Sequence, residues 1–404
     1  MASSLTRSAA LLTRLVLGAF TLSLAGCIGS SLPGLDPSAA APPTPAQAPA
    51  PSGTVLGSGT VKVALILPLT GPGQGAVAAQ SMRNAAELAL QEFQNPDLTV
   101  LVKDDRGTPE GAREAANQAI AEGAELIVGP VFAGSVRAAG QVARQAGRPV
   151  IAFSTDAGVA ARGVYLLSFL PQAEVDRIVD HAAAQGRRSI AALIPETTYG
   201  SVVEAQFREA TARRGIRVAA IERYPAGQPQ AAVQRLAPII GGASPQADAL
   251  FIPDNGDGLP TVAQALQTAG FNPQRVKPLG TGVWDEARVF ALPALQGGWF
   301  AAPDVRGFHA FADRYRARFN TDPTRLATLS YDAISLAAAL ARTQGSQRFS
   351  EGVLTNPSGF AGADGVFRFR QDGTNDRALA VLEIRNGASA VVSPAPRMLG
   401  APGT

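Results

Sequence analysis

The chain has little of the chemistry that metal sites and many catalytic sites need. Its 404 residues include one cysteine, Cys27, which excludes a disulfide within the chain and a metal site built from several cysteines. The two histidines, His181 and His309, each fall in a predicted helix with no second metal ligand near it. Neither H-E-x-x-H nor G-x-S-x-G occurs, so zinc-protease and nucleophile-elbow chemistry lack their minimum parts. We therefore expect no catalytic residue, no metal and no enzymatic activity.

Nucleotide cofactors are not expected either. No G-x-x-x-x-G-K-[ST] loop is present to cradle phosphates. The segment Gly71-x-Gly73-x-x-Ala76 has the spacing of a dinucleotide fingerprint, but no acidic residue ends the second predicted strand at the usual distance. We interpret Gly71 and Gly73 as a tight turn that lines a cleft.

Charge and length narrow the remaining classes. Lys and Arg number 35 against 32 Asp and Glu, a net charge of +3 without any basic block, so a nucleic-acid partner is not expected. A chain of 404 residues with 46% hydrophobic residues exceeds the usual size of one core and predicts two or more lobes.

The N-terminus indicates export. Arg7 and Arg14 precede a short apolar run, residues 15–24, which is typical of a signal peptide rather than a membrane span. The run ends in Leu24-Ala25-Gly26-Cys27, which resembles the lipobox of bacterial lipoproteins and implies a lipid on Cys27. Because residue 28 is Ile rather than Asp, resemblance to enterobacterial sorting rules favours the outer membrane. We expect residues 1–27 to be the signal peptide and lipobox of a periplasmic, lipid-anchored protein.

Two further segments have the composition of unstructured chain. Residues 28–59 are rich in Pro, Ala, Gly and Ser and predict an extended tether. In a polyproline conformation of about 3.1 Å per residue, such a tether reaches on the order of 100 Å. Residues 391–404 predict a flexible tail of similar composition.

Between these segments, apolar runs with the composition of buried strands alternate with amphipathic helices. The first series begins with the strand at 61–67 and has short connections, which predicts a doubly wound parallel sheet. The pattern restarts after about residue 169 and ends in two helices and a hairpin of residues 365–369 with 378–385. The chain should therefore cross between lobes more than once. We assign residues 60–168 plus 303–344 to lobe 1 and residues 169–302 plus 345–390 to lobe 2.

Two turns of the first lobe are the strongest binding candidates. The runs 126–128 and 149–153 each end in small and hydroxyl residues before a helix or turn. In an open parallel sheet, ligands bind where strand carboxyl ends meet helix N-termini, because unpaired backbone N–H groups point outward there. These turns contribute Ser135, Ser154, Thr155 and Asp156 to the candidate site.

The second lobe offers three more candidates, each with a structural alternative. Trp284 follows a strand and either stacks on a ligand or packs in the core. Tyr199 either points its hydroxyl into the cleft or belongs to a helix start. Asn255 lies in a polar turn, where Asp, Asn and Gly are common without any ligand.

The whole body, from about residue 60 to 390, resembles the leucine-binding-type (type I) periplasmic solute-binding proteins. That resemblance implies an α/β fold of two lobes, each a parallel sheet flanked by helices, with three crossovers and a hinge that closes on a ligand. It also implies a small polar ligand such as an amino acid, an ABC permease as partner, and no catalysis. The residues that carry it are 64–72, 104–109, 126–130, 149–155, Tyr199-Gly200, Ser330-Tyr331-Asp332, 365–369 and Asp372-Gly373.

Both poles of the amino-acid clamp implied by the resemblance look altered. Asp156 lies about where a Thr would meet the ligand carboxylate, and like charges repel. The acid that would meet the ligand ammonium falls near Gly282, which has no charge. The long tether, the lipobox and the altered clamp also suit a subgroup of the same fold, the penicillin-binding protein activators, which are outer-membrane lipoproteins that contact a peptidoglycan synthase. The hypotheses are therefore a transport receptor and a cell-wall regulator.

Overall fold

The computed structural model describes residues 52–399. Contacts group Ala48–Thr404 into one compact unit. The lipobox, most of the predicted tether and the last residues of the predicted tail lie outside the described residues. No helix within residues 52–399 is both long and apolar enough to cross a membrane.

Lobe 1 is built on a six-stranded sheet in the order β1-β3-β2-β4-β5-β6. β2 to β6 run parallel, while β1 pairs antiparallel with β3. The central strands are buried on both faces, as expected for continuous apolar runs in a parallel sheet. The strands are β1 (Val55–Gly57), β2 (Val61–Leu67), β3 (Leu98–Asp104), β4 (Leu126–Val128), β5 (Val150–Ala152) and β6 (Val164–Leu166).

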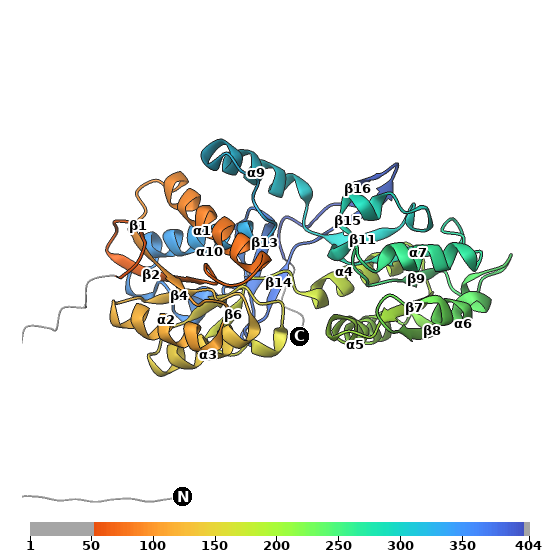
Figure 1. Cartoon of the computed structure of the whole chain (residues 1–404), viewed down its shortest axis with the longest axis horizontal. Helices are drawn as coiled ribbons and strands as arrows, with labels where there is room; N and C mark the ends of the chain where they lie inside the picture. The colour runs from red at the N-terminus through yellow and green to blue at the C-terminus, as the bar shows by residue number, and fades with distance from the viewer. Residues whose placement is uncertain (1–51, 400–404) are drawn as a thin grey trace, which may run out of the picture. The chain divides into compact units, whose positions relative to one another are not determined.

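Helices cover both faces of this sheet (Figure 1). α1 and α10 pack with one face and α2 and α3 with the other. α2 buries a stripe of alanines at helical spacing, and its N-cap Thr108 accepts a hydrogen bond of 3.0 Å from the Gly111 backbone N–H. The helices are α1 (Gln74–Glu92), α2 (Pro109–Ala121), α3 (Ala133–Gln145), α9 (Val305–Phe319), α10 (Ala327–Thr343) and α11 (Glu351–Leu354).

Lobe 2 is built on a seven-stranded sheet in the order β16-β15-β11-β10-β9-β7-β8. Five strands run parallel, and the β15–β16 hairpin joins β11 antiparallel. α4 and α5 cover one face, and α6 and α7 cover the other. The elements are α4 (Pro171–Ala184), β7 (Ser189–Pro195), α5 (Thr198–Arg213), β8 (Arg217–Tyr224), α6 (Gln230–Ile240), β9 (Ala249–Phe251), α7 (Leu259–Thr268), β10 (Lys277–Gly280), α8 (Ala287–Phe290), β11 (Trp299–Ala302), β15 (Ala380–Arg385) and β16 (Ala388–Ser393).

Three connections join the lobes, and together they give the predicted two-lobed α/β fold. The first runs from β6 to α4, the second from β11 to α9, and the third from a small antiparallel sheet to β15. That small sheet packs its phenylalanines on the core of lobe 1. Its strands are β12 (Phe360–Gly362), β13 (Gly365–Phe369) and β14 (Asn375–Arg377).

The structure differs from the sequence-based boundaries in three places. Residues 345–379 pack with lobe 1, not lobe 2, because Phe349, Leu354 and the phenylalanines of β13 bury their apolar surface there. The expected hairpin of 365–369 with 378–385 is instead β13 with β14, while β15 joins the lobe 2 sheet. Residues within the expected tether and tail also form strands, β1 and the end of β16, since each finds an open sheet edge to pair with.

A buried polar cluster fixes the first described residues on lobe 1. Ser52 donates from its backbone N–H and its hydroxyl to Glu122 Oε1, at 2.9 and 2.8 Å. Lys103 Nζ lies 2.8 Å from Glu122 Oε2 and donates to the Ser52 carbonyl at 2.6 Å. The side chains of Lys103 and Glu122 are only 4% and 3% exposed, so each charge relies on the other for compensation.

Removing one member of this cluster should therefore be costly. We expect Glu122→Ala to lower the free energy of unfolding by about 3–5 kcal/mol, because it leaves the Lys103 ammonium buried without its partner. The control is Glu114→Ala, whose pair with Arg106 is 68% and 50% exposed and should cost less than about 1 kcal/mol. Denaturant unfolding followed by circular dichroism measures both. Equal losses in the two variants would contradict the assignment.

Candidate ligand-binding site

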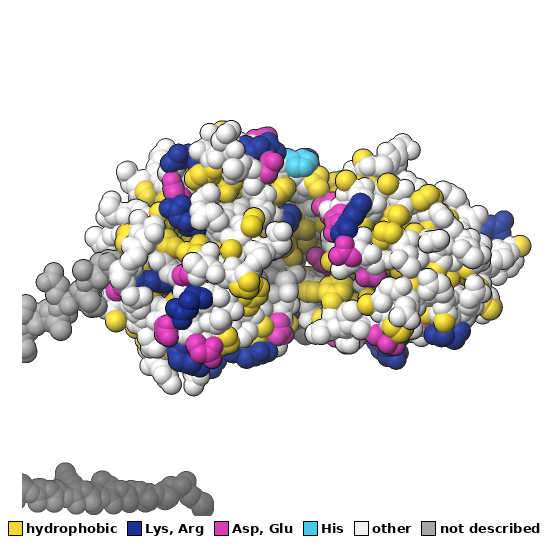
Figure 2. Space-filling model, in the orientation of Figure 1, with side chains coloured by type: hydrophobic (Ala, Val, Ile, Leu, Met, Phe, Trp, Pro, Cys, Tyr) yellow, Lys and Arg dark blue, Asp and Glu magenta, His cyan; other side chains and the backbone are white. Residues whose placement is uncertain are grey.

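A cavity of about 430 Å³ lies between the lobes, beside the first two crossovers. Figure 2 shows the molecule hollowed between the lobes, with acidic and apolar side chains along the hollow. Small-ligand sites of this kind combine apolar walls with a few polar groups. The lining residues are Thr155, Phe169, Pro171, Glu174, Tyr199, Gly282, Val283, Asp285, Ala302, Pro303 and Arg325.

Parallel-sheet topology explains why these segments meet. Thr155 follows β5 in lobe 1, and Gly282 follows β10 in lobe 2, so both lie at strand carboxyl ends. Glu174 and Tyr199 lie in the first turns of α4 and α5, which begin at the same edge of the lobe 2 sheet. The fold thus brings residues about 130 positions apart into one cavity.

Glu174 is the buried acid of the cavity. Its Oε2 accepts a hydrogen bond of 2.9 Å from the Gly282 backbone N–H, and the residue is 7% exposed. Burial raises the pKa of Glu174 to about 8, against the opposing effects of the Gly282 hydrogen bond and the Arg325 charge. A Cβ at position 282 would lie 2.6 Å from Glu174 Oε1, so a larger residue there would displace the carboxyl group. A carboxyl group therefore lies beside the uncharged Gly282, and it comes from the first turn of α4.

Arg325 is the basic residue of the lining. Its two terminal nitrogens donate to the two oxygens of Asp364, each at 2.8 Å, and the Asp364 side chain is fully buried. Its guanidinium also lies 4.6 Å from the ring centre of Phe169 and 4.8 Å from that of Phe308. These contacts hold the guanidinium plane in place while 36% of the side chain stays exposed.

Two further polar groups complete the wall. The Tyr199 hydroxyl lies 2.6 Å from Thr281 Oγ1, and burial raises the pKa of Tyr199 above its usual range, so the phenol stays neutral. Burial also raises the pKa of Asp285, while the charges of Arg325 and His309 lower it. The cavity thus combines a fixed cation, two acids with raised pKa and a neutral phenol.

The structure brings Thr155 and Tyr199, of the sequence-predicted set, to this cavity. Ser154 is buried, and its hydroxyl accepts from the Asp156 backbone N–H at 3.1 Å. Ser135 is buried and does not line the cavity. Asp156 does not line the cavity: it pairs with Arg137 at 3.1 Å and accepts from the Gly158 N–H at 2.9 Å. The charge expected to repel a ligand carboxylate is therefore engaged elsewhere.

Four other candidates lie outside the cavity lining. Trp284 is fully buried in the lobe 2 core, where its Nε1–H donates to the Ile252 carbonyl at 3.0 Å, so the packing alternative holds. Asn255 accepts from the backbone N–H groups of the turn before α7. Gly71 and Gly73 form the turn before α1, and Gly73 has a positive φ of 62° that favours glycine.

Sequence reasoning missed the charged residues of the cavity, Glu174, Asp285 and Arg325. Glu174 looks like an ordinary acidic residue in the first turn of a helix, where the helix dipole favours it anyway. Arg325 lies between two helices with no strand before it. The one available signal was Gly282, since an uncharged residue at a position where the resemblance predicts an acid invites a search for a nearby substitute.

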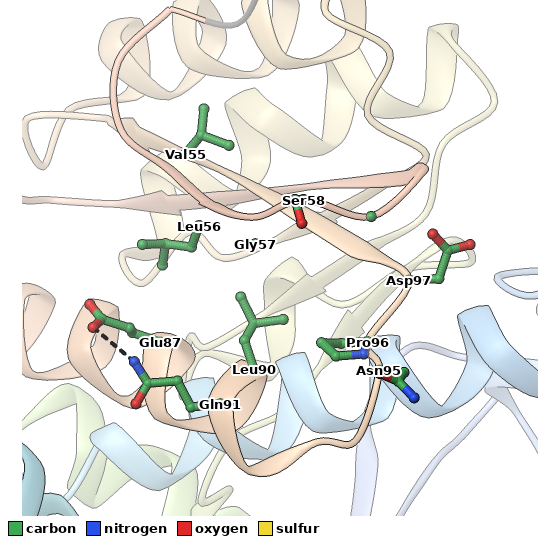
Figure 3. Close-up of a pocket in the computed structure, with 11 residues that line it drawn as sticks. Val55, Leu56, Gly57, Ser58, Glu87, Leu90, Gln91, Asn95, Pro96 and Asp97 are labelled. Atoms are coloured by element: carbon green, nitrogen blue, oxygen red, sulfur yellow. Dashed lines mark hydrogen bonds between the residues drawn. The ribbon is translucent and has the colours of Figure 1, made fainter.

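Two other cavities lie outside the interlobe site, one next to it and one at the far end of lobe 1. A neighbouring one of about 420 Å³ shares Asp285 and Arg325 and extends to His309 and β16. A larger one, about 750 Å³, lies at the N-terminal end of lobe 1 between β1 and α1, where Gln91 donates a 3.2 Å hydrogen bond to Glu87 (Figure 3). Within residues 52–399 no group of three His, Cys, Asp or Glu side chains is placed to hold a metal ion.

The raised pKa of Glu174 predicts a pH dependence of stability. The folded protein keeps a proton that the unfolded chain releases near pH 4.5, so this contribution is complete below about pH 4.5 and is lost as the pH rises to about 8. The free energy of unfolding of the wild type, relative to Glu174→Gln, should therefore fall by a few kcal/mol over that window, at about 1.4 kcal/mol per unit.

Glu204→Gln is the control of opposite sign. The hydrogen bond from Arg223 lowers the pKa of Glu204 below its value of 4.5 in the unfolded chain. The ionised Glu204 therefore stabilises the fold fully above about pH 4.5, and this stabilisation is lost only at lower pH. Between about pH 5 and 8 the difference between wild type and Glu204→Gln should stay constant. The same constancy for Glu174→Gln would exclude a buried, protonated Glu174.

Comparison with known proteins identifies the family to which this fold belongs. Residues 60–389 match the family model described as periplasmic binding protein. A branched-chain amino-acid ABC transporter structure from Rhodospirillum rubrum is 20% identical, with a TM-score of 0.73, covering 82% of this chain and 99% of its own. A solute-binding protein from R. palustris in complex with benzoate is 20% identical, with a TM-score of 0.58 and coverages of 84% and 98%.

A branched-chain amino-acid substrate-binding protein from Streptococcus pneumoniae in complex with isoleucine is also 20% identical, with a TM-score of 0.58 and coverages of 83% and 100%. The comparison with curated proteins gave no significant match. The family consists of substrate-binding proteins of the periplasm. The chain therefore belongs to the periplasmic binding proteins of the leucine-binding type.

Proposed function

We propose that this protein is a non-enzymatic substrate-binding lipoprotein that captures a small carboxylate-bearing ligand between its lobes and delivers it to an ABC permease. The observation that carries the proposal is the interlobe cavity of about 430 Å³ with Arg325 in its wall. Arg325 is oriented by Asp364 and two aromatic rings but keeps an exposed part, as a carboxylate-binding arginine requires.

The remaining lining refines the ligand class. Glu174 and Asp285 offer acceptors for a ligand amino or hydroxyl group, while Phe169, Val283 and the prolines supply apolar walls. A zwitterionic amino acid or a small hydroxylated carboxylic acid satisfies both sets. The ligands of the solved relatives, isoleucine and benzoate, each carry a carboxylate, which supports this direction.

The position of the cavity supports capture by closure. Phe169 lies on the first crossover and Pro303 on the second, so a ligand between the lobes contacts the segments about which a hinge turns. A ligand that contacts both lobes binds the closed state better than the open one, and this difference in affinity drives the closure.

A thermal-shift screen against amino acids and small aliphatic or aromatic carboxylates tests this function. A ligand at 100 times its Kd should stabilise the protein by about 2.7 kcal/mol. The double variant Arg325→Met/Asp364→Asn should abolish the shift; it removes both charges of the pair, so neither is left buried alone.

The matched control is Arg162→Met/Glu351→Gln, which removes an ion pair of lobe 1 that lies outside the cavity. It should keep the shift. No shift with any carboxylate, or an equal shift in both double variants, would refute a carboxylate site at Arg325.

The predicted lipid at Cys27 and outer-membrane location belong to this proposal and rest on residues outside the described part of the chain. The same features support the alternative function, activation of a penicillin-binding protein, because a regulator that contacts a peptidoglycan synthase through the cell wall needs a long tether. Residues 52–59 of the expected tether belong to lobe 1 instead, where Ser52 binds Glu122 and Val55–Gly57 forms β1.

Capture of partners from membranes separates the two functions. We expect cross-linking of the lipidated chain, followed by purification, to recover an ABC permease and not a penicillin-binding protein. Cys27→Ser, which cannot be lipidated, is the control for the anchor: it should leave the membrane fraction. Recovery of a penicillin-binding protein together with a failed ligand screen would favour the regulator.

A further inference from the structure

Basic side chains gather at the amino edge of the lobe 2 sheet, where its parallel strands begin. Arg187 and Arg188 precede β7, and Arg217 is the first residue of β8. Arg275 and Lys277 lie at the start of β10, and Arg385 ends the antiparallel β15 at the same edge. We call these six residues the basic edge.

Strand register sets the basic edge in a row. Ser189 pairs with Arg217, and both Ile190 and Lys277 pair with Ala249, so β8, β7, β9 and β10 begin at one level. β15 lies two strands further on, beyond β11. At about 4.8 Å between strands, the five intervals from β8 to β15 span about 24 Å. Figure 2 shows Lys and Arg side chains at the right-hand end of lobe 2.

The charges of the basic edge are largely without acidic partners. Arg217 donates to the Gln246 carbonyl and Arg275 to the Ala243 carbonyl, so neither guanidinium is neutralised. The Arg188 side chain has no partner among residues 52–399. Elsewhere in the described chain most exposed arginines pair with a carboxylate, as Arg214 does with Asp180.

Counting the acids leaves a clear excess. Asp248 and Glu383 are the acidic residues at this edge, so six cations against two anions give a charge of +4. Asp248 accepts from the backbone N–H groups of Arg188 and Ser189, and Glu383 pairs with Arg385. The net charge of the whole chain is only +3, so its positive excess is concentrated here.

The equivalent edge of lobe 1 lacks this excess. Acidic residues precede two of its strands, Asp97 before β3 and Glu125 before β4. In lobe 2 only Asp248, before β9, is an acid in such a position. Two of the cations there are paired, Arg162 with Glu351 at 2.7 Å and Arg348 with Glu125 at 3.5 Å. Two others, Lys62 at the start of β2 and Arg148 before β5, have no carboxylate partner among residues 52–399. Four cations thus stand against the acids Asp97, Glu125 and Glu351. The two sheets share a topology, so the basic edge is a property of lobe 2 and not of the fold.

We propose that the basic edge docks lobe 2 on an anionic lipid surface. Arginine forks match phosphate oxygens, and several cations spread over about 24 Å contact many headgroups at once. The edge has no apolar anchor of the kind that protein interfaces bury, since the exposed large apolar side chains of the described chain are Val55, Val77, Phe132, Val391 and Met398. The expected lipid at Cys27 would keep the edge near a membrane at high effective concentration. The proposal needs neither the cavity nor its ligand.

Sedimentation with lipid vesicles tests the proposal on residues 28–404, which contain the whole compact unit and no lipid. Wild type should bind vesicles with about 30% phosphatidylglycerol and not pure phosphatidylcholine, and about 0.5 M NaCl should release it. Arg188→Glu/Arg217→Glu/Arg275→Glu should weaken binding at least about tenfold, since each charge near an anionic surface contributes about fivefold.

Two further variants separate the role of the basic edge from a general effect of net charge and from a loss of stability. Arg113→Glu/Arg144→Glu/Arg342→Glu makes the same charge change on exposed helix positions of lobe 1 and should bind within about twofold of wild type, because those side chains lie away from the edge. The glutamine version of the edge triple should melt like wild type and still lose binding. Equal loss in both glutamate triples, or no binding by wild type, overturns the proposal. Binding to poly-glutamate but not to the anionic vesicles would also overturn it, in favour of an acidic protein partner.

Discussion

The ion pair between Arg325 and Asp364 brings together segments next to all three crossovers. Asp364 belongs to the small sheet that precedes the third crossover, and the rings beside the guanidinium come from the first crossover and from α9. Phe169 also contacts the buried Arg377 of β14, whose guanidinium carbon lies 4.8 Å from the ring centre. A bidentate pair with a fully buried carboxylate tolerates little change of geometry, because the Asp364 charge alone would be strongly destabilising. One contact therefore fixes both the crossover segments and the cation of the cavity.

On the acidic side of the cavity, one side chain also links two separate segments. Glu174 extends from the first turn of α4 to a glycine that follows β10, and its burial keeps it largely protonated at neutral pH. A protonated carboxyl group both donates and accepts hydrogen bonds, so it suits a ligand hydroxyl as well as an amino group. In the function proposed here, Arg325 therefore selects a carboxylate, while Glu174 is more permissive.

Lobe 2 is electrically polarised along its strands. Glu196, Asp257 and Glu286 lie at the carboxyl edge that faces the cavity, while the basic edge lies at the other end. No basic block is visible in the sequence because the six cations come from segments spread over some two hundred residues, and only the parallel register aligns them. Such a charge pattern arises in the folded sheet, because its residues are single and far apart in the sequence.

The sequence by itself determined the architecture: apolar runs long enough to be buried strands, amphipathic helices between them, and small residues in the turns. Those properties are local, so periodicity and composition report them directly. Which side chains face the cavity was decided by the tertiary structure. Trp284 could have pointed to a ligand or to the core, and the space beside Gly280 and Ile252 fixed it in the core. Glu174 and Arg325 became cavity residues only because the crossovers bring α4 and the segment before α10 together, a contact between positions about 150 residues apart that no local pattern encodes.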